Sequence, residues 1–274
     1  MNNSIKPGVS VILTIYNGMP FINDSIESVL AQSYSNIELI IIDDGSNDGT
    51  KQYLKKEYSN NNNIKLIDSG RIGRAKALNL GLKLSRGKYI GIIDADDIFL
   101  RNKTDLQVKF LEKNSEYVLV GSKSMAKNFD TGVIVSNSEE RPITNNDIRE
   151  YFLIGQPIQH SCVMIRKTAI DKIGGYNEET DFLLDRDLFL RLAINGGKLY
   201  NLNKFLVHIG IHNKRFFYHT FHGKIRIKKD YHYRFVAARM LKKSFLFKIK
   251  LWFYFQWNLL PLQLRSIIKL KFIK

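Results

Sequence analysis

The sequence predicts an α/β protein with a mostly parallel central sheet and helices on both faces of that sheet. Short runs rich in isoleucine and valine, such as Val9–Thr14 and Ile37–Asp43, are typical of buried parallel strands. The segment between them carries Ile22, Ile26 and Val29 at helical spacing. Because parallel strands are joined by right-handed crossovers, this alternation places helices on both sides of one sheet.

The same alternation continues along the first half of the chain. The expected elements are, in order, strand Val9–Thr14, helix Phe21–Gln32, strand Ile37–Asp43, helix Thr50–Tyr58, strand Ile64–Ile67, helix Arg74–Leu84, strand Tyr89–Ile93, helix Lys103–Lys113 and strand Tyr117–Val120. Each is bounded by polar residues or glycine, which are the usual ends of such elements.

The second half is less regular. From Lys123 to Thr144 the periodicity weakens, and we expect an irregular excursion over the sheet. A second α/β portion follows, with a strand at Cys162–Ile165 and helices at Thr168–Ile173 and Asp187–Asn195. Gly196 directly after the last helix is a typical helix end.

Composition indicates a folded protein of a reducing compartment. Hydrophobic residues make up 44% and charged residues 25% of the 274 residues, which are ordinary globular values. The single cysteine, Cys162, excludes an internal disulfide and a thiolate zinc cage. The start of the chain lacks the pattern of a signal peptide, so we expect a cytoplasmic enzyme body.

The net charge of +16 is concentrated in the tail. Residues 224–274 hold fourteen lysines and arginines against one acid, Asp230, whereas residues 1–223 hold 28 bases and 25 acids. The tail also contains the aromatic run Leu251–Trp257, which is too short and too interrupted to span a bilayer. We expect a helical anchor on an anionic membrane surface, with the two tryptophans of that run inserted. Nucleic acid is the rival partner of a cationic segment, and we do not expect it to bind here.

Three carboxylates follow the apolar strand Tyr89–Ile93 within four residues. Asp94, Asp96 and Asp97 repel one another when ionised, and a divalent cation is a common relief. The carboxyl ends of strands are where open α/β sheets bind ligands. We therefore expect a metal site that handles the diphosphate of a nucleotide compound.

Polar loops follow two other strands at the same edge. In the loop Asp43–Gly49, Asp44 is placed to accept a hydrogen bond from a base N–H, such as N3–H of uracil. A plain turn in which Asn47 or Asp48 caps the next helix explains this loop equally well. Arg71 and Arg74 follow the third strand, and they either contact phosphate or ribose or are solvated surface arginines.

Asp185 stands at the start of a predicted helix in the second half. An N-cap role would explain an aspartate at this point. A carboxylate held there can instead act as general base for an incoming hydroxyl group.

Taken together, these pieces resemble the family 2 glycosyltransferases of the bacterial surface-polysaccharide type. Those are inverting enzymes of the Rossmann-like GT-A fold that use nucleotide-activated sugars. The matching segments are Val9–Asn17, Asp43–Ser46, Gly73, Ala77–Leu82, Gly87–Ile90, Asp94–Asp97, Ile173–Tyr176 and the helix at Asp185. Their order and spacing make the resemblance specific.

The resemblance implies roles in binding the donor. Thr14 and Tyr16 would border the nucleotide, and Asp44 would read its base, with uracil expected. Asp94 would contact ribose or support the metal. Asp96 would coordinate the Mg²⁺ or Mn²⁺ ion that bridges the diphosphate.

The resemblance also implies the catalytic base and a second metal ligand. Asp185 takes the place of the base of the family, although Leu184 stands where the family usually has glutamate. His212 would reach the diphosphate or the metal, and a purely structural histidine is the alternative. The family often has arginine two residues before that histidine, where this chain has Gly210. His160 is a weaker candidate for a functional histidine.

These inferences define two expected regions and one expected reaction. Residues 1–223 would form the GT-A domain, with residues 1–122 as its nucleotide-binding half and residues 123–223 as its acceptor-binding half. Residues 224–274 would form the basic membrane-associating tail. The enzyme would move a sugar from a UDP-sugar to a glycan or lipid-linked glycan acceptor in capsule, lipopolysaccharide or exopolysaccharide synthesis. It would work at the inner face of the plasma membrane.

Two other classes of function stay open on the sequence. A nucleotidyltransferase can combine a parallel sheet with a carboxylate-bound metal, but it would be expected to carry a lysine in the loop after the first strand. The segment Thr14–Gly18 has no lysine. A non-catalytic membrane adaptor is the third class, and the presence of Asp44, Asp96 and Asp185 argues against it.

Overall fold

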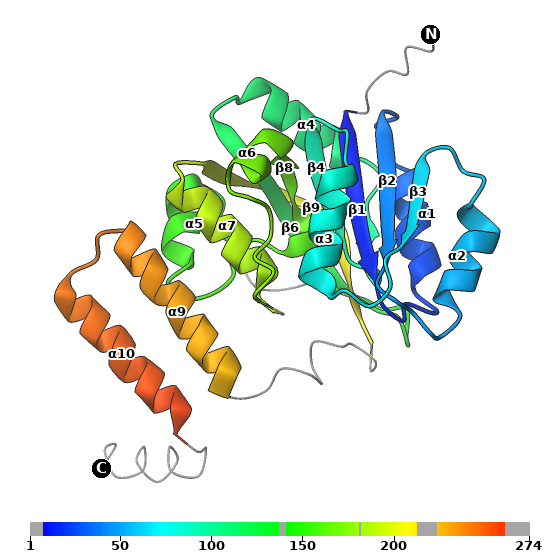
Figure 1. Cartoon of the computed structure of the whole chain (residues 1–274). Coiled ribbons are helices and arrows are strands. Elements are labelled where there is room, and N and C mark those ends of the chain that lie inside the picture. Colours follow the sequence, from blue (N-terminus) through cyan, green and yellow to red (C-terminus); the bar gives the residue numbers. More distant parts are fainter. Residues whose placement is uncertain (1–7, 137–140, 181, 213–223, 261–274) are drawn as a thin grey trace. The chain divides into compact units, whose positions relative to one another are not determined.

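The structure is a computed structural model that describes residues 8–136, 141–180, 182–212 and 224–260. The chain divides into two compact units (Figure 1). The first comprises residues 1–148 and 157–213, and the second comprises residues 149–156 and 214–274, each as far as it is described. Parts of the expected domains 1–223 and 224–274, namely residues 1–7, 137–140, 181, 213–223 and 261–274, lie outside the described residues.

The first unit is built on one nine-stranded sheet. Its strands are β1 (Val9–Ile15), β2 (Ile37–Asp43), β3 (Ile64–Asp68), β4 (Tyr89–Ile93), β5 (Ile98–Phe99), β6 (Tyr117–Asn128), β7 (Ile134–Ser136), β8 (Met164–Arg166) and β9 (Lys198–Ile211). Their order across the sheet is β3-β2-β1-β4-β8-β6-β9-β5, and β7 pairs with β6. The helices of the unit are α1 (Ile22–Leu30), α2 (Thr50–Tyr58), α3 (Arg74–Leu84), α4 (Lys103–Lys113), α6 (Lys167–Lys172) and α7 (Leu184–Ile194), with a 3-10 turn η1 (His160–Cys162). Helix α5 (Asn145–Tyr151) begins in the first unit, and its residues from 149 onward belong to the second.

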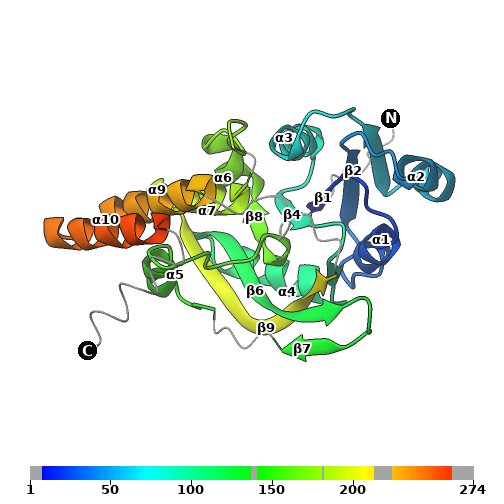
Figure 2. The same ribbon diagram turned by 90° about the horizontal axis from the view of Figure 1, so that it is seen from below.

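The first four long strands are parallel, and helices cover both of their faces. β1 pairs in parallel with β2 and β4, and β2 pairs in parallel with β3. Alternate side chains point to opposite layers: Leu13 packs in the cluster that contains Ile26 of α1, whereas Ile40 packs against Ala77 of α3. Figure 2 shows α1 and α3 on opposite sides of these strands. The predicted α/β architecture with helices on both faces is therefore confirmed.

The second half of the sheet mixes strand directions. β8 runs antiparallel to both β4 and β6, while β9 runs parallel to β6 and antiparallel to β5. The expected irregular excursion from Lys123 is wrong for its first part, because β6 continues to Asn128 and turns back into β7. Register shifts near Ser122 and Lys123 interrupt the β6–β9 pairing, which is why no clean alternation is visible in this segment.

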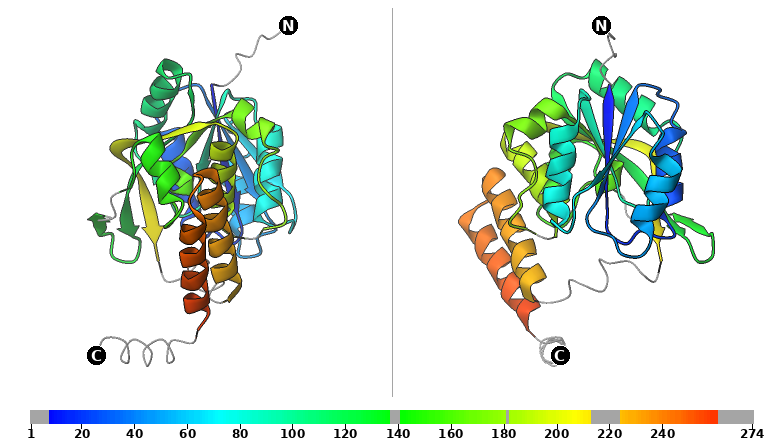
Figure 3. Two further views of the ribbon diagram at one scale, coloured as in Figure 1. Left: turned by 90° about the vertical axis from the view of Figure 1, so that its left-hand side faces the viewer. Right: turned by 45° about the vertical axis from the view of Figure 1, so that its right-hand side comes forward.

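The carboxyl ends of β1, β2 and β3 point to one edge of the sheet (Figure 3). The loops that follow these strands carry the polar side chains singled out in the sequence. Parallel pairing over the full length of β1 and β2 brings Ile15 beside Asp43, so the two loops start side by side. The sheet therefore builds one candidate binding edge.

The second unit contains two helices, α9 (Lys224–Met240) and α10 (Phe245–Leu259), which pack against each other. Tyr231 stacks on Phe255 with ring centroids 4.4 Å apart, and Ser244 caps α10 by accepting from the Phe247 amide. Arg234 of α9 donates to the carbonyl oxygen of Leu153, 2.8 Å away. Every helix among the described residues is too short or too polar to cross a bilayer.

Lys103 on α4 makes the stability of the fold depend on pH. Its ammonium group is fully buried, where Nζ donates to Gln107 Oε1 at 2.8 Å and to the Val163 carbonyl at 3.2 Å. Burial lowers the pKa of Lys103 to about 7, although Cys162 opposes the shift. Between that value and the ordinary lysine pKa, the unfolded chain binds a proton that the folded chain does not.

We therefore expect the free energy of unfolding to rise by about 1.4 kcal/mol per pH unit between pH 7.5 and 9 through this group alone. Lys103→Met should remove that slope, whereas Lys109→Met, at an exposed position of the same helix, should keep it. Urea unfolding at pH 7.5 and at pH 9 measures the free energy of unfolding of each variant at the two ends of this range. Parallel pH profiles for the wild type and Lys103→Met would contradict the assignment.

Candidate active site

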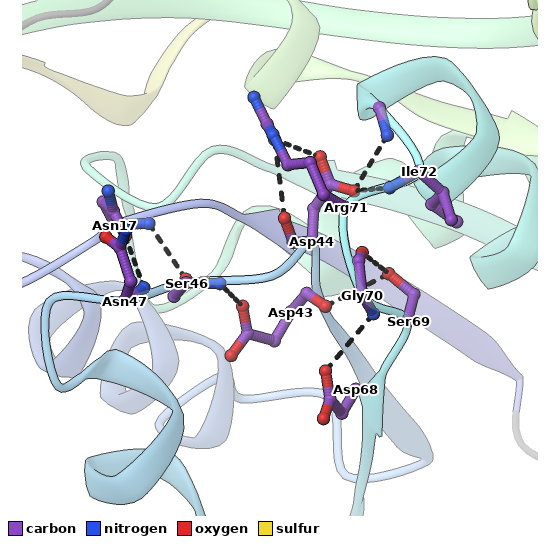
Figure 4. A network of polar contacts seen from close by, with 11 residues as sticks. Asn17, Asp43, Asp44, Ser46, Asn47, Asp68, Ser69, Gly70, Arg71 and Ile72 are labelled. Atoms are coloured by element: carbon purple, nitrogen blue, oxygen red, sulfur yellow. Dashed lines mark hydrogen bonds and ion pairs between the residues drawn. The ribbon is translucent and has the colours of Figure 1, made fainter.

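The Asp44 carboxylate is the centre of the first cluster (Figure 4). It is buried, and its Oδ1 accepts the backbone N–H groups of Ile72 at 2.7 Å and Gly73 at 2.9 Å. Its Oδ2 forms an ion pair with Arg71. The Arg71 guanidinium also lies over the ring of Tyr16, 3.6 Å from its centroid. Three residues predicted from three separate loops are thus in direct contact.

The loop that carries Asp44 is tied to the loop after β1. The Asn17 amide donates to Ser46 Oγ at 2.9 Å, and the Asn47 amide donates to Asn17 Oδ1 at 2.9 Å. Asp48 Oδ1 accepts the Thr50 amide at 3.0 Å, but the N-cap of α2 is Gly49, so the expectation that Asn47 or Asp48 caps this helix is wrong. These contacts support a stable turn and place Asp44 beside Tyr16, so the turn and binding interpretations of this loop are compatible. Thr14 lies in β1 opposite Ile42 and is half-buried.

A second cluster surrounds Arg74 at the start of α3. Its Nη2 forms an ion pair with Asp94 and lies 3.3 Å from His160 Nδ1. Asp94 raises the pKa of Arg74, burial opposes the shift, and Asp185 and Asp96 add to the rise. The Arg74 guanidinium therefore interacts electrostatically with carboxylates of the loop after β4 and of α7.

Asp185 lies within the first turn of α7 and not at its N-cap, so the expectation of a cap before the helix is wrong. The N-cap is Leu183, whose backbone is left-handed with φ 56°. Asp185 Oδ1 accepts the adjacent Arg186 amide at 2.9 Å. The helix N-terminus favours a negative charge at this point, which stabilises the carboxylate.

Asp96 and His212 form the third cluster. His212 Nε2 lies 3.1 Å from Asp96 Oδ2, and the imidazole stacks on Phe21 with centroids 4.1 Å apart. His212 Nδ1 is buried and has no hydrogen-bond partner among the described residues. A carboxylate and an imidazole nitrogen that converge in this way fit as two ligands of a divalent cation.

This donor set would be completed by the substrate. Among the residues that the structure describes, no group of three His, Cys, Asp or Glu side chains could hold a metal ion. Mg²⁺ is commonly held by one or two carboxylates together with substrate phosphates. A site with two protein ligands therefore fits a metal that arrives with a diphosphate.

Gly210 explains the missing arginine near His212. A Cβ atom at this position would lie 2.0 Å from the Asp96 carbonyl oxygen, which is a severe clash with backbone. The Gly210 amide donates to the buried Asp97 Oδ1 at 3.0 Å. Burial raises the pKa of Asp97 well above its usual range, and Asp96 and Asp94 raise it further. The close approach of β9 to the acidic loop therefore requires glycine at position 210.

The structure brings His160, the weaker candidate, and Tyr176, which the sequence did not single out for a role, to the Arg74 cluster. His160 Nε2 lies 2.8 Å from the Tyr176 hydroxyl, and both side chains are buried. The signal for Tyr176 is the preceding Gly174-Gly175 pair, both left-handed with φ 77° and 74°, which marks a tight turn. The sequence cannot show that this turn faces Arg74, because the contact joins segments about a hundred residues apart.

The chain is similar to known proteins over most of its length. The family model for glycosyl transferase family 2 matches residues 10–174. A Bacillus subtilis protein named glycosyltransferase EpsE is 36% identical over 208 residues, which cover 73% of this chain and 72% of EpsE. The chondroitin synthase of Escherichia coli is 29% identical over 231 residues, which cover 84% of this chain and 32% of the synthase.

Solved structures share the fold. The crystal structure of S. aureus TarS 1–349 in complex with UDP-GlcNAc superposes with a TM-score of 0.65 at 18% identity, covering 89% of this chain and 69% of that one. The mannosyltransferase PcManGT from Pyrobaculum calidifontis, in complex with GDP-Man and Mn²⁺, gives 0.62 at 18% identity, covering 88% and 66%. The predicted GT-A architecture is confirmed by these likenesses.

Proposed function

The chain belongs to glycosyltransferase family 2, and on that premise we propose that it transfers a sugar from a UDP-sugar to a hydroxyl group, with inversion at the anomeric carbon. The observation that carries the proposal is the position of Arg74, which forms an ion pair with Asp94 beside the acidic loop after β4, while Asp94, Asp185 and Asp96 all raise its pKa. This arrangement supports a single site in which Asp94 and Asp96 would bind the donor and Asp185 would activate the acceptor.

The first cluster supports recognition of a base by its edge. Arg71 is a pure hydrogen-bond donor, and the ionised Asp44 beside it is a pure acceptor. This pair matches a base edge that offers a carbonyl oxygen next to an N–H group, as uracil does. Guanine offers the same pattern, whereas cytosine and adenine do not. Tyr16 is 40% exposed beside the pair and can border the nucleotide. Thr14 lies near the end of β1, two residues before Tyr16.

The second and third clusters support the transfer step. Asp96 and His212 would hold Mn²⁺ or Mg²⁺, and such an ion stabilises negative charge on a departing diphosphate. Asp94, held by Arg74, would face the donor ribose. Asp185 would remove the proton from the acceptor hydroxyl as its oxygen attacks the anomeric carbon.

The test is release of nucleoside diphosphate by the purified full-length chain. Incubation with Mn²⁺ and a panel of UDP-, GDP-, CDP- and ADP-linked sugars should give slow hydrolysis of a UDP-sugar. Cytosine and adenine do not offer the pattern that Asp44 and Arg71 match, so the CDP- and ADP-sugars should stay intact. Hydrolysis of a CDP-sugar alone would contradict the assigned roles of Asp44 and Arg71.

We further propose that the acceptor is a lipid-linked or saccharide intermediate of bacterial surface polysaccharide, reached at the inner face of the plasma membrane. The support is the second unit. α10 exposes apolar side chains at Phe245 (76%), Leu246 (70%), Trp252 (46%) and Phe253 (61%), and the spacing of seven residues places them on one face. The surplus of lysine and arginine in residues 224–274 matches an anionic lipid surface.

We expect the double change Trp252→Ser and Phe253→Ser to weaken binding to liposomes that contain phosphatidylglycerol by about tenfold, because two aromatic side chains no longer insert. Trp257 is half-buried and should contribute less to liposome binding than Trp252, whereas the sequence predicts that both tryptophans insert. Flotation measures the effect. Phe205→Ser, which removes an exposed aromatic of β9, is the matched control. Loss of liposome binding on addition of duplex DNA would favour a nucleic-acid partner instead.

A further inference from the structure

We propose that His160 and Tyr176 are positioning residues that aim the Arg74 guanidinium at the leaving diphosphate of the donor. The inference rests on the proposed transferase function. It assigns a purpose to two buried polar side chains that neither the metal pair nor the candidate base uses.

The hydrogen-bond chain has one direction. A guanidinium only donates, so His160 Nδ1 must accept from Arg74 Nη2 across 3.3 Å. The ring proton is then on Nε2, which donates to the Tyr176 hydroxyl oxygen 2.8 Å away. Tyr176 in turn fixes the rotation of the imidazole. Since all three groups depend on one tautomer, loss of His160 removes one of the two contacts that fix the direction of Arg74, and loss of the Tyr176 hydroxyl weakens it, while the ion pair with Asp94 stays.

The turn that carries Tyr176 is clamped from two sides. Asn79 of α3 accepts the Tyr176 amide at 2.8 Å and donates to the Tyr176 carbonyl at 3.0 Å. Arg191 of α7 donates to the carbonyl oxygens of Ile173 at 3.0 Å and Gly175 at 2.7 Å. α3 begins with Arg74 and α7 carries Asp185. The clamp therefore sets the distance between the helices that present the cation and the base.

The Arg74 guanidinium can still donate hydrogen bonds from one side. Both contacts that hold Arg74 use Nη2, and the side chain is 48% exposed. Its Nε and Nη1 hydrogens have no partner among the described residues. Arg74 is held by Asp94, and Asp185 and Asp96 act on it electrostatically, so its remaining edge would meet the negative charge that develops as the sugar leaves the diphosphate. Arginine donates in a fixed fork, so the direction in which it is held decides what it can bind.

The experiment is calorimetric titration of UMP and UDP into the full-length protein in the presence of chelator, so that only protein groups bind the β-phosphate. We expect Arg74→Ala and His160→Ala each to weaken UDP about tenfold, as loss of a charge-assisted contact predicts. UMP affinity should stay within about twofold, since the β-phosphate is absent. Tyr176→Phe should weaken UDP about fivefold, as loss of one hydrogen bond predicts.

Non-additivity is the decisive result. If His160 acts through Arg74, the double variant Arg74→Ala/His160→Ala should bind UDP no more weakly than Arg74→Ala. His160→Gln, whose amide oxygen can accept from Arg74, should restore most of the affinity. Tyr200→Phe, in the aromatic cluster of β9, is the control for Tyr176→Phe.

Two outcomes would overturn the inference, and only the second would also overturn the proposed donor site. Fully additive losses, or equal losses for UMP and UDP, would show that His160 supports the fold and not the aim of Arg74; the proposed function would stand. Failure of the unaltered protein to bind either nucleotide would remove the proposed donor site and this inference with it.

Discussion

Asp185→Asn should lower the turnover of sugar transfer by about a thousandfold while leaving donor affinity within about twofold, because a general base contributes up to four orders of magnitude. The substitution is nearly isosteric, and the asparagine oxygen can still accept the Arg186 amide that Asp185 accepts at 2.9 Å. The amide cannot take a proton from the acceptor hydroxyl. The loss should therefore fall on kcat and not on binding of UDP, which calorimetry measures separately.

Asp171→Asn is the matched control, since it makes the same change at an exposed position of α6, where the carboxylate pairs with Lys167. It should keep wild-type turnover. Hydrolysis of the donor by water gives a second readout, because a base that acts on the acceptor hydroxyl also acts on water. Wild-type transfer by Asp185→Asn would show that another group takes the proton.

The first half of the fold could be predicted because each element there has a local cause. β1 and β2 are continuous apolar strands, and the following loops are polar, so their positions and ends are visible in the sequence. The second half depends on pairing between distant segments. β9 was not predicted, because Asn201, Asn203 and Lys204 break its apolar pattern where it pairs with the bulged β6. No local rule reports that such a strand lies beside β6.

The candidate site shows the same division. The contact of Asp44 with Arg71 and Tyr16 could be anticipated, since all three follow neighbouring parallel strands. The contact of Arg74 with His160 could not, because η1 reaches that edge only through the antiparallel strand β8. Sequence supplies residue types at strand ends, whereas partners from the second half require the folded chain.

The acidic trio after β4 leads to the second large prediction, because the structure gives each carboxylate a different partner. Asp94 pairs with the Arg74 cation. Asp97 is buried against the Gly210 amide, and burial raises its pKa, so it supports the approach of β9. Asp96 is the member that meets an imidazole, His212, at 3.1 Å. The sequence assigned the relief from repulsion to one cation, whereas in the structure Asp94 pairs with an arginine, Asp97 is buried and Asp96 meets His212, the pair proposed to bind the metal.

We therefore expect Asp96→Ala to abolish the dependence of UDP affinity on Mn²⁺ and to lower turnover by about a thousandfold, since metal stabilisation of a departing diphosphate amounts to several kcal/mol. His212→Ala should reduce the Mn²⁺ dependence of UDP affinity and lower turnover by only about tenfold, because the negative charge that attracts the ion is on the Asp96 carboxylate. Asp105→Ala, which removes a half-buried carboxylate of α4 that pairs with Lys109, is the control. Titration of UDP into each variant, once with Mn²⁺ and once with chelator, measures how much affinity the ion adds. If Asp96→Ala kept the full gain in affinity from Mn²⁺, the ion would be held elsewhere and the Asp96–His212 pair would be structural.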